Sequence, residues 1–306
     1  MKMKMNYENF KAALYKDLSE KLEEEVELLM EAVKKQNGVL RDAITARFPN
    51  SPVSPVIYLD DAYEAYETGE MSYEKIVDIV TTSLMETKPK VQRIDRKTAL
   101  ENLFLTVMER NKNTALLENV PHENLEDLAL VARCGVAITL PNGDVSQGSV
   151  LVNNEVLQLI EMTGEEALQV ALANTNRQNV LCMPLEETVF GSSISGNMNI
   201  PKEFEDELTR KKNPSLWLLT NEELFGGAGL IASAPALQMA KNEIGGNFFI
   251  LPSSVHELLL IPDNEDIDPT TMKEIVESVN ETAVKPVEKL SDSIYYYDGD
   301  RVTRVA

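Results

Sequence analysis

The chain is poor in the residues that build disulfide frameworks and metal centres. Its 306 residues include two cysteines, Cys134 and Cys182, and two histidines, His122 and His256. Two thiols cannot form a disulfide framework, and both lie in apolar segments, so a reducing, cytoplasmic environment is expected. A zinc site would have to combine these few residues with carboxylates from remote segments. We therefore expect no metal and no cofactor.

Long apolar runs are also missing. No segment reaches the roughly 18 apolar residues that a membrane-spanning helix needs. The start of the chain, M-K-M-K-M-N-Y, has two lysines, but no apolar signal-peptide core follows them. We expect neither a membrane span nor a secretory leader.

Positive charge is scarce in the last two thirds of the chain. The formal net charge is −21, from 29 basic and 50 acidic residues. Residues 1–100 hold 15 basic and 18 acidic groups, residues 101–200 hold 4 and 13, and residues 201–306 hold 10 and 19. Such a chain repels phosphate groups, so we expect no direct nucleic-acid binding and no binding to anionic lipid. The acidity either serves solubility or mimics nucleic acid to inhibit a DNA-binding protein.

Residues 1–95 are predicted to form a helix-rich region. Apolar residues three or four apart predict one amphipathic helix over residues 6–35, with Gly38 as its left-handed cap. The other elements expected here are a strand over 56–59 and helices over 60–68 and 72–85, the last with Ser72 as N-cap. The tyrosines of this region are interpreted as core packing: Tyr58, Tyr63, Tyr66 and Tyr73.

Residues 96–306 are predicted to form an α+β domain with a largely antiparallel sheet and interspersed helices. Asn142-Gly143 and Asp298-Gly299 indicate hairpin turns. Thr163 and Glu166 form a capping box, and Asp268-Pro269 indicates another helix start. The stretches G-S-V-L-V-N-N-E-V-L-Q-L-I and A-G-L-I-A-S-A-P-A-L-Q-M-A share a strand–strand–helix order, which suggests two related halves. The strands expected are 103–108, 125–140, 148–153, 215–220, 225–233, 248–252, 255–261 and 294–303, and the helices expected are 113–119, 155–162, 165–174 and 235–244.

Six blocks, in order along the chain, resemble a family of uncharacterised proteins. They are K-K-Q-N-G-V, S-P-V-I-Y-L-D-D-A-Y-E-A-Y-E-T-G, N-V-P-H-E-N-L-E-D-L-A-L-V, E-E-A-L-Q-V-A-L-A-N-T, I-L-P-S-S-V-H-E-L-L-L-I-P and L-S-D-S-I-Y-Y-Y-D. The family occurs in anaerobic, largely gut-dwelling Firmicutes and is known as a domain of unknown function. The resemblance covers nearly the whole chain and implies no reaction, cofactor or catalytic residue. His122 stands where we expect an aromatic residue such as tyrosine, so the resemblance gives it no role.

Known catalytic motifs are incomplete. His256-Glu257 matches the start of the zinc-protease motif H-E-x-x-H, but Leu260 replaces the second histidine. An EF-hand loop aligned on D-N-E-D-I-D-P-T-T-M-K-E has Ile267 where an oxygen ligand belongs. F-G-G-A-G-L lacks the lysine and hydroxyl of a phosphate-binding loop, so a hairpin turn or bulge is favoured. No G-x-S-x-G elbow of a serine hydrolase is present.

One polar group remains a catalytic candidate. The segment P-S-S-V-H-E sets Ser254 and His256 on one face of a predicted strand, and Glu257 on the other face. A general base needs an acidic partner, for which Asp292 of L-S-D-S is the candidate. Alternatively, Pro252 interrupts the strand and the serine hydroxyls bond to free backbone groups.

Three hypotheses about function follow. The favoured one is a non-enzymatic cytoplasmic protein that binds another protein. The second is a hydrolase centred on Ser254 and His256, with Asp292 as the acid. The third is an inhibitor that mimics DNA, which requires the carboxylates of residues 101–306 to lie on one face.

Overall fold

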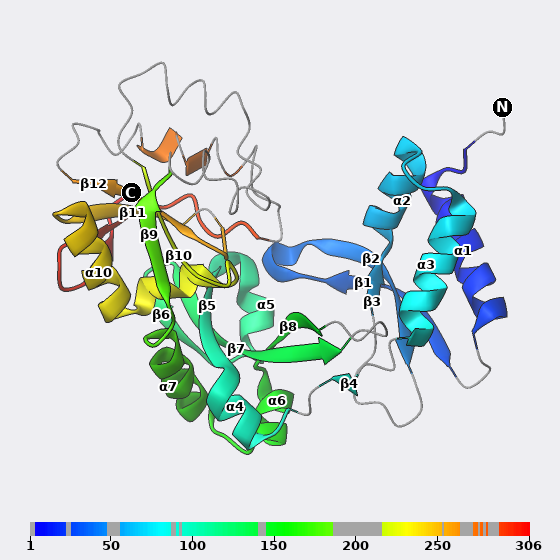
Figure 1. Ribbon diagram of the computed structural model, residues 1–306, viewed down its shortest axis with the longest axis horizontal. Coiled ribbons are helices and arrows are strands. Elements are labelled where there is room, and N and C mark those ends of the chain that lie inside the picture. The colour runs from blue at the N-terminus through cyan, green and yellow to red at the C-terminus, as the bar shows by residue number, and fades with distance from the viewer. Residues whose placement is uncertain are drawn as a thin grey trace. The chain divides into compact units, whose positions relative to one another are not determined.

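The protein has an α+β fold with antiparallel sheets, as predicted (Figure 1). By contacts the chain divides into two compact units, one of residues 1–93 with 136–148 and one of residues 94–135 with 149–306. No helix within the described residues combines the length and the apolar character needed to cross a membrane. The computed structural model describes residues 4–22, 26–47, 56–86, 90–91, 94–139, 145–185, 216–252, 254–263, 272–274, 276–277, 280 and 288–306.

The first unit begins with a helix that is shorter than predicted. Helix α1 spans Tyr7–Lys21, and the backbone becomes extended at Leu22. Strand β1 (Glu27–Lys34) then pairs along its whole length with β2 (Leu40–Arg47). The single helix predicted over residues 6–35 is therefore wrong beyond Lys21. A short apolar run fits a strand as well as a helix, and here the pairing with β2 decides between them.

The turn between β1 and β2 explains the Asn-Gly pair at its tip. Asn37 and Gly38 both have positive φ values, of 61° and 70°. The Lys35 N–H donates to the Val39 carbonyl oxygen (2.7 Å) across this turn. Asn and Gly adopt the left-handed conformation more readily than other residues, so they let the chain reverse here. The predicted role of Gly38 as a helix cap is wrong, because its positive φ serves a hairpin.

The core of this unit lies between its helices and its sheet. Phe10 is fully buried, and the rings of Tyr63, Tyr66 and Tyr73 surround it at centroid distances of 5.3, 5.4 and 5.9 Å. These three tyrosines pack in the core as predicted, whereas Tyr58 carries two cationic side chains over its ring. The remaining elements are β3 (Val56–Tyr58), α2 (Leu59–Thr68), α3 (Tyr73–Glu86) and β4 (Lys90–Val91).

The second unit contains two sheets and a set of short helices. The helices are α4 (Arg96–Asn102), η2 (Asn111–Asn113), α5 (Thr114–Leu117), α6 (Asn154–Ile160), α7 (Gly164–Thr175), η3 (Gly227–Ala232) and α10 (Ala234–Ile244). The strands of its second sheet are β9 (Val180–Pro184), β10 (Trp217–Asn221), β11 (Phe248–Leu251), β12 (Leu258–Pro262), β13 (Tyr295–Tyr297) and β14 (Val302–Arg304). They lie in the order β14-β13-β11-β12-β10-β9.

Strand β7 (Leu128–Thr139) is central to the other sheet. Both β5 (Leu103–Glu109) and β6 (His122–Leu125) pair with its first residues, so they lie on opposite edges. Strand β8 (Val145–Leu151) also pairs with β7, and β4 pairs with its end. The even-numbered residues at the start of β7 pack on one face, in the two cores that also contain η3 and α10 or α6 and α7. The odd-numbered residues Ala129 and Val131 pack on the other face, in the core that contains α5. Both faces of β7 are therefore buried.

The glycine-rich stretch F-G-G-A-G-L contributes to the 3-10 helix η3, so the strand predicted over residues 225–233 is wrong. Gly229 packs directly on β5, where an added Cβ would lie 2.1 Å from the Leu105 carbonyl oxygen. Gly227 lies similarly close to the Thr220 side chain and the His256 carbonyl oxygen. These glycines are needed for close packing. Because η3 stands where a strand is expected before α10, the predicted similarity between the two halves does not extend to their strands.

Several local signals are confirmed. Thr163 and Glu166 form the predicted capping box of α7, and the Ser72 hydroxyl accepts the Lys75 N–H (3.3 Å) at the start of α3. Gly299 has a φ of 100° in the turn between β13 and β14. The turn at Asn142-Gly143, the helix start at Asp268-Pro269 and Ser253 lie outside the described residues.

Candidate functional site

All three predicted catalytic residues lie on two segments that run side by side. Ser254 forms a β-bridge with Lys289, and the Val255 N–H donates to the Glu288 carbonyl oxygen (3.0 Å). At the other end, the Ser291 N–H donates to the carbonyl oxygen of residue 252 (3.3 Å). We call these two segments, residues 252 and 254–257 and residues 288–295, the paired segments. His256 therefore lies on one of them and Asp292 on the other.

The hydroxyl of Ser254 bonds within its own segment. Ser254 is only 5% exposed, and its Oγ accepts the backbone N–H of His256 (3.1 Å). It also bonds to the Glu257 side chain. Residues 255 and 256 form a bend, and β12 begins only at Leu258. The predicted strand over 255–261 is therefore too long at its start, and the prediction that Glu257 faces away from Ser254 is wrong.

The His256 ring is held between a backbone donor and an acid. Its Nδ1 accepts the Gly226 N–H (3.3 Å), which makes Nε2 the protonated nitrogen of the neutral ring. Nε2 lies 4.0 Å from the Glu288 carboxylate, and the Phe225 ring packs on the imidazole at a centroid distance of 5.4 Å. The acid beside His256 is thus Glu288 of the second of the paired segments, whereas the acid nominated from the sequence is Asp292.

Glu257 is the most perturbed carboxyl group of the site. Burial raises its pKa from 4.5 to about 7, and the charge of Glu288 acts in the same direction. The hydrogen bond with Ser254 opposes this rise only in part. Glu257 consequently changes its charge near neutral pH, where an ordinary glutamate is fully ionised.

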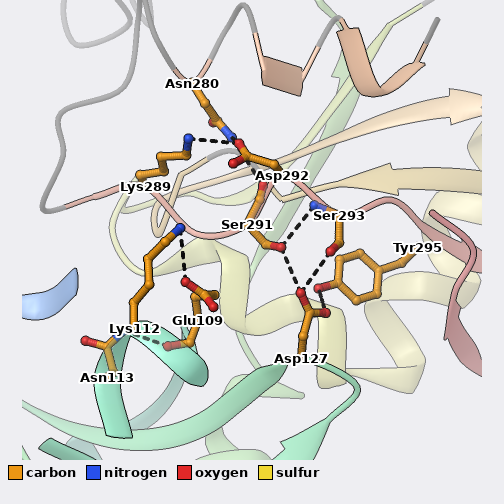
Figure 2. Close-up of polar contacts among 10 residues, drawn as sticks. All are labelled: Glu109, Lys112, Asn113, Asp127, Asn280, Lys289, Ser291, Asp292, Ser293 and Tyr295. Atoms are coloured by element: carbon orange, nitrogen blue, oxygen red, sulfur yellow. Dashed lines mark hydrogen bonds and ion pairs between the residues drawn. The ribbon is translucent and has the colours of Figure 1, made fainter. Parts of the chain in front are cut away.

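Asp292 bonds to residues other than His256. Its carboxylate accepts the Asn280 side-chain N–H (2.7 Å) and forms an ion pair with Lys289 at 2.9 Å (Figure 2). Burial alone would raise the pKa of Asp292, but these two partners and the nearby charge of Lys112 bring it below its ordinary value. Asp292 is therefore an ionised anchor for its own segment, and a role as the acid of a catalytic triad stays a prediction.

Sequence reasoning missed a cluster of hydroxyl groups around Asp127. This residue lies in the turn between β6 and β7, and its carboxylate accepts the hydroxyls of Ser291 (3.0 Å), Ser293 (2.8 Å) and Tyr295 (Figure 2). Burial would raise the pKa of Asp127, but these hydrogen bonds outweigh it and keep the pKa below the ordinary value. The three hydroxyls stand at alternate positions of L-S-D-S-I-Y, which in an extended segment places them on one face. This alternation of hydroxyl-bearing residues is the sequence signal from which the cluster could have been predicted.

Acid–base chemistry is what the site can offer. Glu257, Glu288 and His256 gather at one end of the paired segments, and a group that titrates near neutral pH can give or accept a proton. The described residues contain no group of three or more His, Cys, Asp or Glu side chains arranged to hold a metal ion.

The fold and this site define an α+β protein with a partly buried polar junction between two segments of its second unit. The chain belongs to a family of unknown function (DUF5688), which it matches over residues 7–299. This confirms the resemblance to an uncharacterised family. No curated protein and no solved structure is detectably similar to the chain.

Proposed function

We propose that this protein acts in the cytoplasm by binding another protein and has no catalytic activity of its own. One observation carries the proposal: the side chains nominated for catalysis are each engaged in a hydrogen bond or ion pair that fixes the local structure. The Ser254 hydroxyl accepts the His256 N–H, the His256 ring accepts the Gly226 N–H, and Asp292 holds Lys289. The two cysteines are free thiols, which supports a reducing compartment.

The exposed leucines of two neighbouring helices support a binding surface. Leu159 of α6 is 65% exposed and Leu100 of α4 is 45% exposed, although the two helices pack against each other and bury their other faces. Large apolar side chains that gather on one surface are typical of protein–protein contacts, and we infer that these two leucines do so. We call Leu100 and Leu159 the leucine surface.

The charge of the chain indicates what kind of partner fits. Leu159 lies in residues 101–200, and Leu100 immediately precedes them. In this part of the chain acidic groups outnumber basic groups by 13 to 4. Complementary charge speeds association and selects partners. Helix α4 itself carries the exposed Arg96 and Lys97 beside Leu100, so the expected partner is a protein with an apolar contact surface and charged residues of both signs around it.

Affinity purification of the tagged full-length chain from its native host tests this proposal. We expect a stoichiometric partner with the wild type and at least about ten-fold lower recovery with the double variant Leu100→Glu/Leu159→Glu, because charges would be buried in the contact. Ile79→Glu, which changes a 43%-exposed residue of α3, is the matched control and should retain the partner. Repeated recovery of the bare protein, or equal loss in both variants, would contradict the proposal.

A hydrolase is the second candidate, favoured by Glu257, whose pKa of about 7 suits acid–base catalysis beside His256 and Ser254. A fluorophosphonate probe, which reacts with activated serines, distinguishes the two. If the protein only binds, labelling of the folded wild type should equal that of Ser254→Ala. Labelling at Ser254 that disappears in a folded His256→Ala variant would instead establish the hydrolase, and reduced labelling in Asp292→Ala would identify the acid.

A further inference from the structure

Strand β1 is an edge strand of the three-stranded sheet β1-β2-β3. All eight residues of Glu27–Lys34 pair with β2 on one side. Within the described part of the chain, no strand pairs with its other side. An edge of this length presents a row of backbone N–H and C=O groups that can pair with another strand.

The backbone groups that face this open edge can be assigned. The Lys35 N–H donates to the Val39 carbonyl oxygen of the neighbouring chain segment, so residue 35 points its backbone groups toward β2. Successive residues of a strand point these groups to opposite sides. The odd-numbered residues of β1 therefore bond to β2, and the backbone groups of residues 28, 30, 32 and 34 face outward. Among these groups, the Leu28 carbonyl oxygen already accepts the Tyr15 hydroxyl (3.2 Å).

Exposed side chains line the same strand. Met30, in the middle of β1, is 41% exposed, although it is paired with the fully buried Ile44 of β2. Its neighbours Glu31 and Ala32 are exposed as well. A large apolar side chain next to an unpaired edge is typical of a strand that another chain covers.

Symmetry limits how two copies of β1 can pair. A twofold axis that relates two antiparallel strands stands perpendicular to the sheet, because only this axis exchanges the strands and reverses their direction. It therefore sets one residue opposite its own copy, and each other residue opposite one of the same parity. This keeps the face that carries the helices on the same side of the joined sheet in both copies.

Registers with the axis near the middle of β1 pair the most residues, and charge selects among these. With the axis at Glu31, Glu27 lies opposite Lys35 at both ends, Leu29 lies opposite Val33, and Met30 lies opposite Ala32. With the axis at Met30, Glu27 lies opposite Val33 and has no basic partner. With the axis at Leu29, Glu27 lies opposite Glu31, which places two like pairs in the contact. Opposite charges and apolar pairs across strands are stabilising, whereas like charges are destabilising.

We propose that a second copy of this chain covers β1, through antiparallel pairing of the two β1 strands about a twofold axis at Glu31. The two three-stranded sheets then form one continuous sheet. A twofold contact of this kind uses the same surface of both copies and closes on itself. The pairing is independent of the leucine surface, so failure of one proposal leaves the other standing.

The residue at the centre of this contact allows a prediction of whether a substitution strengthens or weakens the dimer. Glu31 faces its own copy there, and this single like pair opposes association. Glu31→Gln removes the repulsion and should tighten the dimer by at least about two-fold. Sedimentation velocity of the full-length chain measures the change, and the wild type is expected to form a concentration-dependent dimer. A wild type and a Glu31→Gln variant that both stay monomeric at about 100 μM, a concentration typical of weak association, would overturn the proposal.

A charge exchange at the ends of the strand tests the register. Glu27→Lys turns two attractive pairs with Lys35 into repulsive ones and should weaken the dimer about ten-fold. The double variant Glu27→Lys/Lys35→Glu restores opposite charges and should recover it. Glu27 also lies 3.7 Å from Arg47 within its own sheet, and both variants lose this ion pair. The double variant in addition loses the contact of Lys35 with the Tyr58 ring, so its recovery would come from the contact between copies.

The experiment must distinguish a loss of pairing between two copies from a loss of folding within one copy. Glu27 is an exposed residue, so circular dichroism spectra of all these variants should match that of the wild type. If the double variant is folded and stays as weak as Glu27→Lys, the two residues do not face each other and the proposed register is wrong.

Discussion

Glu257→Gln is expected to stabilise the protein at pH 8 and to have little effect at pH 4.5. The pKa of Glu257 is about 7 in the folded protein, against 4.5 for an ordinary glutamate, because the carboxyl group is buried and lies near Glu288. The folded state therefore holds this proton more tightly than the unfolded state does. The resulting stabilisation is complete below pH 4.5 and is lost as the pH rises through 7.

The size of this effect follows from the two pKa values. Their difference corresponds to ~3 kcal/mol, so ionised Glu257 destabilises the folded state by about that amount at pH 8. Glutamine has nearly the same shape and carries no charge, and it can still accept a hydrogen bond from Ser254. The variant should be about 2–3 kcal/mol more stable than the wild type at pH 8, and the gain should shrink between pH 7 and pH 4.5.

Urea denaturation at several pH values between 4.5 and 8 measures this difference. Glu243→Gln, which removes a charge from an exposed residue of α10, is the matched control and should change the stability by less than about 1 kcal/mol. A Glu257→Gln variant that gains nothing at pH 8, or gains the same amount at every pH, would show that burial does not hold the proton on this carboxyl group.

Gly229→Ala is expected to destabilise the protein by about 3 kcal/mol or more. The added Cβ would lie 2.1 Å from the carbonyl oxygen and 2.7 Å from the carbonyl carbon of Leu105. Both atoms belong to the backbone of β5, which is paired with β7 and cannot move alone. Relief of the overlap requires η3 to move away from β5, which opens the shared apolar core.

Gly246→Ala is the matched control for this prediction. A Cβ at Gly246 would meet no atom within 4 Å, so the substitution should change the free energy of unfolding by less than about 1 kcal/mol. Urea denaturation of both variants makes the comparison. Equal stability of Gly229→Ala and Gly246→Ala would mean that η3 does not pack on β5 as closely as described.

Sequence signals that act over a few residues predict much of the fold. The capping box of Thr163 and Glu166 and the N-cap Ser72 can be recognised because the side chain and its backbone partner are three residues apart. The strands β5 and β10 and the helices α7 and α10 follow from their hydrophobic period. The Asn-Gly rule that predicts hairpins also applies at Asn37-Gly38, where the apolar run before it favoured a helix.

The candidate site is predicted only in part. Sequence reasoning nominated Asp292 of L-S-D-S as the acid for Ser254 and His256, and the segments that carry these three residues lie side by side. It could not select Glu288 rather than Asp292 as the neighbour of His256. That choice depends on the bend after Ser254, where the hydroxyl bonds to a backbone N–H within the segment.

The sequence by itself determined the α+β class, most helix boundaries and the family, because caps, turns and hydrophobic periods depend on neighbours within a few residues. Only the tertiary structure decided that residues 27–34 form a strand, that residues 227–232 form a packed 3-10 helix, and that Asp127 bonds to Tyr295, 168 residues away. In each case the deciding partner lies outside the local segment. A carboxylate in a turn shows no sign in the sequence of which hydroxyls will surround it, since burial and hydrogen bonding arise only once the segments meet.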